Sequence, residues 1–323
     1  MNKKNILIRI SIKKHLHELK RREKRKKKRL ENLNEKKWKK IIFYKRNPPK
    51  NFSLINNTNN VLSYFEKYEK EVWSIRAIDF DLWNISNLSF DAVAFLLVKV
   101  NEFSKEVLIK WLPPKNPSLN KLFKESDFYS FVSSNLNIND IEIKAKAINH
   151  KSSKIVSPEI AWAISDYIDS WIDIITRKHF YSTLIECMQN TNNHAWECNW
   201  WVFIHDNTEK WIKEICFIDL WIWILWSLNT KFENFKDIIW PFLWNAYNID
   251  KIFWLFKWKW WWIESITKEK KRWNWLKDIY NFSQNLNVRE FIVITNDIKI
   301  NLKNNNSQKL KYNFKWTLYY WEI

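Results

Sequence analysis

The chain has 323 residues, a net charge of +19, three cysteines, no glycine and 24 tryptophans. This length allows about two domains, and so few cysteines exclude a disulfide-stapled secreted scaffold. No apolar run is long enough to span a membrane, and residues 1–30 lack the apolar core of a secretion signal, so we expect a cytoplasmic protein.

The absence of glycine conflicts with the needs of a folded chain. A protein of this length normally contains about 23 glycines, because turns, helix ends and phosphate loops use conformations that glycine adopts without strain. Trp221, Trp223, Trp273 and Trp275 stand at such places. We predict that most tryptophans occupy glycine positions, as expected if UGA codons for glycine were translated as tryptophan. The alternative is a tryptophan-rich protein without glycine.

Three tryptophans do not fit this reassignment. Trp200 and Trp201 open an apolar strand pattern, and Trp321 lies in another near the C-terminus. Large apolar side chains suit such strands. We expect these three to be genuine tryptophans.

Most of the positive charge lies at the N-terminus. Residues 1–50 hold 21 Lys and Arg against 4 Glu, whereas the rest of the chain holds 33 basic and 31 acidic residues. We interpret residues 1–46 as a basic, partly helical tail. It is either a solvated segment or, over residues 13–40, a contact for an anionic partner such as nucleic acid or a membrane surface.

Residues 47–150 alternate between strand and helix patterns after the boundary motif Asn47-Pro48-Pro49. Helices are predicted over 60–71, 90–102 and 118–134, and strands over 75–80 and 107–110. This order predicts an α/β domain whose sheet is at least partly parallel. In pattern and spacing the segment resembles the STAS-like domains, although an unrelated α/β scaffold would give a similar pattern.

Residues 151–323 form the second predicted domain. Ser157 as N-cap and Pro158 at the first helical position predict a helix that runs to about residue 176. Further helices are predicted over 179–195, 231–249 and 274–286. Strands are predicted over 200–206, 212–219, 289–295, 297–303 and 309–323.

Glu186, Asn190 and His194 are spaced four residues apart on the predicted helix 179–195 and share one helix face. This pattern resembles the N-box of the GHKL ATPases, the family of gyrase, histidine kinases and MutL. The resemblance implies that Asn190 binds Mg²⁺ through its amide oxygen and that Glu186 is the base that orients the attacking water. By itself, such a pattern more often marks a polar helix face.

The strand that ends at Asp219 is followed by Leu-Trp-Ile-Trp-Ile. With glycine at Trp221 and Trp223, the segment becomes Asp-x-Gly-x-Gly and resembles the first glycine box of the same family. The resemblance implies that Asp219 accepts a hydrogen bond from the amine of adenine. The two glycines would let the backbone pass close to the base.

The segment Arg-Trp-Asn-Trp-Leu before the last predicted helix becomes Arg-Gly-Asn-Gly-Leu in the same way and resembles the second glycine box. Its backbone N–H groups would face phosphate at a helix N-terminus. Residues 257–272 would then be the ATP lid, although a disordered basic loop is the alternative. The implied nucleotide contacts in this part are Thr267, Arg272, Trp273, Asn274, Trp275 and Leu276.

Thr317 completes the set, because Trp316-Thr317 reads as Gly-Thr in the last predicted strand, where the family has a threonine near adenine. The five motifs follow the family order over residues 157–323. The resemblance implies an α/β sandwich of the Bergerat type, with a mixed sheet covered by helices on one face. Its ligands would be ATP and Mg²⁺.

We therefore expect a Mg-ATP-binding protein, a slow ATPase that acts as a nucleotide-dependent switch or regulator for a protein partner that the sequence does not identify. Homodimerisation is compatible with this role. The alternative is a serine/threonine protein kinase of the anti-sigma-factor type that acts on a STAS-type partner. A nucleotide with a purely structural role is a third option.

Overall fold

The computed structural model describes residues 42–126, 128, 148–153, 156–168, 172–194, 199–220 and 274–323, and for some residues at the edges of these ranges it describes the backbone alone. Within this part of the chain, the strands form a three-stranded, a five-stranded and a two-stranded sheet, and helices pack against them. None of the described helices is both long and apolar enough to cross a membrane. The N-terminal tail up to residue 41, helix 231–249 and lid 257–272 of the sequence prediction lie outside the described residues.

The N-terminal domain is an α/β unit with a parallel sheet, as predicted. Its main sheet has the order β1-β3-β5, and every pair in it is parallel. A second parallel pair joins β2 and β4. The elements are β1 (Tyr44–Lys45), β2 (Asn51–Phe52), α2 (Thr58–Glu71), β3 (Ala77–Asp81), β4 (Asn87–Leu88), α3 (Phe90–Phe103), β5 (Leu108–Leu112) and α4 (Pro117–Glu125).

Two elements of this domain differ from the sequence prediction. Strand β1 lies before the Pro48-Pro49 motif, in the segment that was assigned to the tail, and it pairs with β3. A two-residue strand is too short to leave a periodic signal. Helix α4 ends at Glu125, whereas the prediction continued it to residue 134, which lies outside the described residues.

The second sheet has five strands in the order β6-β7-β8-β10-β9, and all of its pairs are antiparallel. The sequence predicted a mixed sheet, so this detail is corrected for the described strands. The strands are β6 (Ile148–Ser153), β7 (Trp200–Asn207), β8 (Ile212–Asp219), β9 (Glu290–Asn301) and β10 (Asn306–Glu322). β6 was not predicted, and the expected domain boundary at residue 150 falls inside it.

Strand β9 joins two segments that were predicted as separate strands. Asn296 has φ 54° there, and the register against β10 shifts around Phe314. Asparagine tolerates this left-handed conformation better than most residues. The break in the sequence pattern therefore marks an irregularity inside one bent strand.

Helices α6 (Pro158–Tyr167), α7 (Ile174–His194) and α12 (Asn274–Ser283) belong to the second domain. The Ser157 hydroxyl accepts a hydrogen bond from the Ile160 N–H, and Pro158 occupies the first turn, which confirms the predicted start of α6. The helix ends at Tyr167 rather than near residue 176. In the first turn of α7, Asp173 accepts hydrogen bonds from the N–H groups of Ile175 and Thr176.

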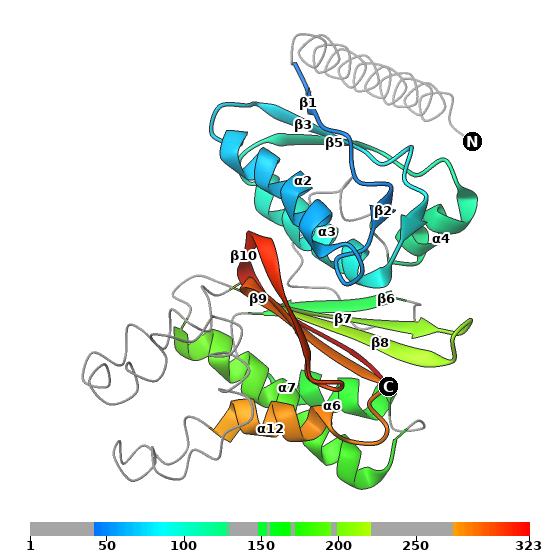
Figure 1. The fold of residues 1–323 in the computed structure, drawn as a ribbon, viewed down its shortest axis with the longest axis vertical. Helices are drawn as coiled ribbons and strands as arrows, with labels where there is room; N and C mark the ends of the chain where they lie inside the picture. The colour runs from blue at the N-terminus through cyan, green and yellow to red at the C-terminus, as the bar shows by residue number, and fades with distance from the viewer. Residues whose placement is uncertain are drawn as a thin grey trace, which may run out of the picture.

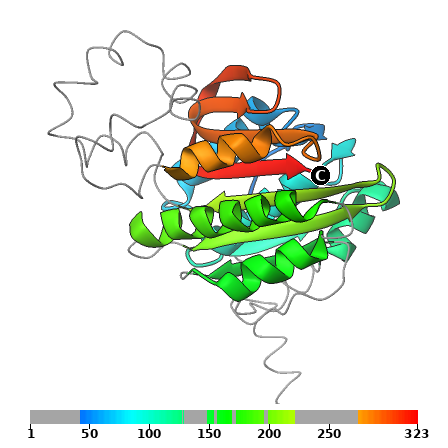
Figure 2. The same cartoon turned by 90° about the horizontal axis from the view of Figure 1, so that it is seen from below.

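The second sheet is covered on both faces, which corrects the expectation of helices on one face. Figure 1 shows α6, α7 and α12 below this sheet and α2 and α3 above it, between the two sheets; Figure 2 shows the lower helices in front of the sheet, running in roughly the same direction as its strands. Alternate residues of β7, β8, β9 and β10 enter two separate cores. Trp200 packs with α7, whereas Trp201 packs with the N-terminal domain.

Candidate functional site

Two of the predicted nucleotide contacts, Asp219 and Thr317, come together in the second sheet. They are directly opposite each other on β8 and β10, although 98 positions separate them in the sequence. Both are buried. Their strand alternation places them with Phe217 and Tyr319 on the face that α7 covers. The pairing therefore brings a carboxylate and a hydroxyl together on this face of the sheet.

Three further polar groups on this part of the sheet were missed by the sequence interpretation. The Thr295 hydroxyl on β9 lies 3.1 Å from the Thr317 hydroxyl, and Thr295 also donates to the Asn296 side chain at 3.1 Å. The Tyr319 hydroxyl and the Asn199 side-chain oxygen are buried without a hydrogen-bond partner among the described residues. Buried polar atoms usually have partners, so these two are places where a ligand or water would complete the hydrogen bonding. Only the strand register reveals them.

Helix α7 brings the predicted N-box next to Asp219. Cys187 is buried, and burial, followed by the negative charge of Asp219, raises the pKa of its thiol well above the ordinary value. Burial and then the charges of Cys187 and Asp219 likewise raise the pKa of Tyr319. The negative charge of Asp219 therefore raises the pKa of a side chain on α7 and of one on β10.

Glu186 lies on α7 beside Cys187 and is half-buried. Burial, followed by the charge of Asp278 on α12, raises the pKa of its carboxyl above the ordinary 4.5. A raised pKa makes a carboxylate a better general base near neutral pH. The predicted base on α7, the helix of the predicted N-box, therefore lies near α12, the helix that begins within the predicted second glycine box.

The remaining predicted site residues are described in part or not at all. Asn190 and His194 lie in the last turns of α7, and Asn274, Trp275 and Leu276 in the first turn of α12, but their side chains lie outside the described part. Trp221, Trp223, Thr267, Arg272 and Trp273 fall outside the described residues altogether. Within the described ranges, no group of three or more His, Cys, Asp or Glu side chains could hold a metal ion.

These positions define what the site can do chemically. A buried carboxylate and two hydroxyls offer hydrogen-bonding groups on the sheet, and α7, which covers this face, carries Glu186, a carboxyl with a raised pKa. These groups can donate hydrogen bonds to a polar ligand and accept them from it, whereas the side chain of the predicted metal ligand Asn190 lies outside the described part. No protein-family model and no curated protein sequence matches the chain significantly.

Four of the described tryptophans bear directly on the glycine assignment. Trp200, Trp201 and Trp321 are fully buried in the second sheet, as expected for genuine tryptophans. Trp211, in the turn between β7 and β8, has φ 53° and is 72% exposed. A left-handed conformation costs a non-glycine residue about 1–2 kcal/mol, so this position favours glycine.

Trp316 behaves differently from the expectation of a glycine before Thr317. It is 6% exposed, contacts Phe95 edge-on at 5.6 Å between ring centroids and lies under the Lys99 ammonium at 3.7 Å. Because neighbouring residues of a strand point to opposite faces, Trp316 meets the N-terminal domain while Thr317 faces α7.

Proposed function

We propose that the protein binds Mg-ATP through residues 157–323, hydrolyses it slowly and acts as a nucleotide-dependent switch. The observation that carries the proposal is the pairing of Asp219 with Thr317 beneath α7. The motif-based interpretation required these two residues to meet around one adenine. Their neighbouring positions on one face of one sheet support this interpretation.

The chain's own residues suggest a division of labour. Asp219 would accept the hydrogen bond of the adenine amine, and Thr317, whose hydroxyl lies 3.1 Å from that of Thr295, would bind the base directly or through water. Glu186 would accept a proton from the water that attacks the terminal phosphate. Bound Mg²⁺, held through Asn190, would neutralise charge on the phosphates.

A role as a switch is supported by the path from Thr317 to the N-terminal domain. Trp316, the next residue on β10, contacts Phe95 and Lys99 of α3 on the other side of the sheet. A change in β10 on nucleotide binding would therefore alter a packed contact with the N-terminal domain. Such coupling requires the two nucleotide states to differ in their contacts with that domain. The likeness of this domain to STAS-like domains is part of the proposal.

The glycine assignment has a direct test of its own. Trp221, Trp223, Trp273 and Trp275 would block the nucleotide loops as indoles, so the proposal needs glycine at these four positions. UGA codons there would support the assignment, and UGG codons would refute it.

The activity is tested by incubating γ-³²P-labelled ATP and Mg²⁺ with the purified protein that carries glycine at these four positions. We expect slow release of labelled phosphate, and Glu186→Ala should abolish release while sparing ATP binding. Glu66→Ala, on the exposed side of α2, is the matched control and should leave turnover unchanged. Label transferred to protein would favour the protein-kinase alternative. Bound nucleotide that stays intact would favour a structural role, and no binding at all would refute the proposal.

A further inference from the structure

A cavity of about 780 Å³ opens between the N-terminal domain and the β7–β8 hairpin, on the sheet face opposite Asp219. Its walls come from the starts of α2, α3 and α4 and from the end of β7 with the following turn. This volume lies in the range of small-molecule pockets. The residues used below are Ser89, Phe90, His205, Lys210 and Glu214.

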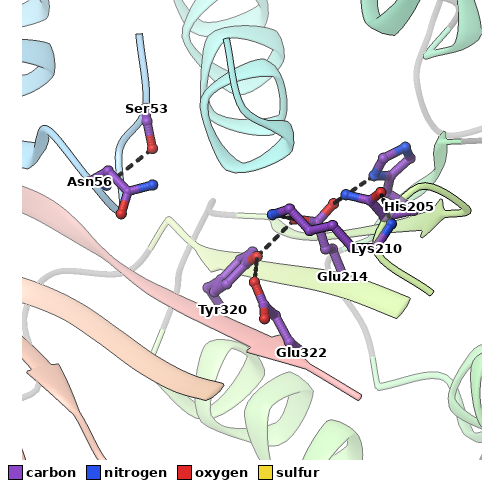
Figure 3. Close-up of polar contacts among 8 residues, drawn as sticks. Ser53, Asn56, His205, Lys210, Glu214, Tyr320 and Glu322 are labelled. Atoms are coloured by element: carbon purple, nitrogen blue, oxygen red, sulfur yellow. Dashed lines mark hydrogen bonds and ion pairs between the residues drawn. The ribbon is translucent and has the colours of Figure 1, made fainter. Parts of the chain in front are cut away.

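His205 is the central side chain of this cavity. It is 8% exposed, and its Nδ1 lies 2.7 Å from the Glu214 carboxylate. Glu214 also accepts hydrogen bonds from Asn207 at 3.1 Å and from the Tyr320 hydroxyl at 3.0 Å. Figure 3 shows His205, Lys210 and Tyr320 arranged around this carboxylate.

The Glu214 carboxylate sets the orientation of the imidazole. Burial disfavours its charge, but the hydrogen bond and charge of His205, with the bonds from Asn207 and Tyr320, outweigh burial and lower its pKa. An ionised Glu214 requires Nδ1 of His205 to donate. The Phe90 ring stacks on the imidazole with centroids 5.3 Å apart, which holds the ring plane. Nε2 is thus left as the binding atom, since no other described residue forms a hydrogen bond with it.

The N-terminus of α3 opens into the same cavity. Ser89 is its N-cap, and its side chain makes no capping hydrogen bond. The acidic residue of the first turn, Asp91, is buried and accepts hydrogen bonds from the N–H groups of Leu54 and Ile55 at 2.6 and 3.0 Å. The first N–H groups of this 14-residue helix carry the partial positive charge that favours an anion.

Of the three acidic residues that line the cavity, Asp206 and Glu214 pair with bases, whereas Glu209 has no ion pair among the described residues. Asp206 pairs with Lys213 at 2.8 Å, and Glu214 is shared by His205 and, at 3.9 Å, by Lys210. Lys210 itself is mostly exposed at the rim. An incoming anion therefore meets a helix N-terminus, a lysine and, when the imidazole is protonated so that both ring nitrogens donate, the Nε2–H of His205.

We propose that this cavity binds a small metabolite through an oxyanion, a phosphate or carboxylate group, held by the Nε2–H of protonated His205, the N-terminus of α3 and Lys210. The site is separate from the proposed ATP site, because Asp219 and Thr317 face the other side of the sheet. A ligand here would contact both domains at once. It would stabilise the packing of the N-terminal domain on the sheet, as any ligand of the native state does.

The test uses the full chain with ¹⁵N-labelled histidine and follows the ring signals by nuclear magnetic resonance while inorganic phosphate, and separately benzoate, is added. The His205 signals are assigned by their loss in His205→Gln or, should that variant not fold, by their proximity to the Phe90 ring. We expect a saturable shift of the Nε2 signal with at least one probe. A response to phosphate alone or to benzoate alone distinguishes the two kinds of oxyanion.

Two lysine variants give the matched comparison. Lys210→Gln should weaken binding about two- to fivefold, as expected for an exposed charge, and should fold because this side chain is mostly exposed. Lys309→Gln, exposed on β10 outside the cavity, should leave affinity unchanged. Absence of a saturable shift with both probes, or equal affinity in Lys210→Gln and the wild-type protein, would overturn the proposal. Retained phosphate affinity in a folded His205→Gln, where we expect a loss of about tenfold, would do the same.

Discussion

The two faces of the second sheet differ in what they cover and in the chemistry they carry. Trp200 and Trp201 are adjacent, equally buried and chemically identical, yet Trp200 faces α7 and Trp201 faces the N-terminal domain. Trp200 is also directly opposite Asp219 on β8. One face therefore combines packing with the polar groups of the candidate nucleotide site, whereas the other forms the contact between domains.

The ionisable residues on the two sides show the same difference. Glu186 on α7 has a raised pKa because it is buried near another carboxylate. Glu69 on α2 is also buried, but Lys99 and Lys315 lower its pKa. A carboxyl group that resists ionisation is typical of catalytic sites, and one held between two lysines is typical of a structural contact. The contrast fits a base in the candidate nucleotide site for Glu186 and a structural contact between the domains for Glu69.

The largest expected effect comes from replacing the two neighbouring tryptophans. Trp200→Ala and Trp201→Ala should each lower the free energy of unfolding by about 3–5 kcal/mol, because each leaves a large cavity in a packed core. Urea denaturation measures this. Only Trp200→Ala should also weaken ATP binding in the folded protein, since it borders Asp219. Equal effects of both variants on ATP affinity would remove the distinction between the faces.

Acidification should affect the domain contact through Glu69. Its Lys315 partner lies 2.6 Å away, and Lys99 also pairs with it. Because the folded-state pKa is lowered, Glu69 stabilises the fold above the ordinary value of 4.5, and this stabilisation is lost as the pH falls through the folded-state pKa. Glu69→Gln should therefore be less stable than the wild-type protein at pH 7, and the gap should narrow below pH 4.5. A constant gap in denaturation experiments across this range would contradict the assignment.

On the α7 side, the rate of ATP hydrolysis should depend on pH through Glu186, whose pKa is raised rather than lowered. Glu186 acts as a base only when ionised, so its raised pKa should make hydrolysis decline on the acid side at a higher pH than an ordinary glutamate would give. Asp278→Asn removes the neighbouring charge and should move this decline to lower pH. Steady-state rates between pH 4 and 8 measure the shift; a decline that does not move would exclude Asp278 as the cause.

The smallest effect concerns a tryptophan outside both cores. Trp211→Gly should raise the free energy of unfolding by about 1 kcal/mol, because glycine relieves the left-handed strain even though it increases the entropy of the unfolded chain. Trp211→Ala is the control, since alanine keeps the strain and removes the same indole. Equal stability of the two variants would argue against a glycine position.

Much of the fold could be predicted from periodicity and end signals. The Ser157-Pro158 start of α6 and strands β7 and β8 were recognisable because their patterns are strong. β6 was missed because Ile-Asn-His-Lys-Ser-Ser has no alternating apolar pattern. The sequence also contains an indication that the second sheet is covered on both faces. The unbroken apolar run that begins at Trp200 is typical of a strand buried on both sides.

The candidate site was predictable only in its members. Asp219, Thr317 and Glu186 were each recognised from a local motif, but their proximity depends on the pairing of β8 with β10 and on the packing of α7. Thr295 and Tyr319 carry no motif and follow only from the register. The anion cavity depends on contacts between two domains, which no single segment of sequence contains.

The most direct test of the central claim is the affinity for Mg-ATP, measured by calorimetry on the chain with glycine at positions 221, 223, 273 and 275. Asp219→Asn should weaken binding about 10- to 100-fold, as expected when a charged hydrogen-bond acceptor of the base is lost. Glu290→Gln, at the start of β9, is the matched control and should bind as the wild-type protein does. Equal ATP affinity in the wild-type protein and Asp219→Asn, or no ATP binding by either, would contradict the account.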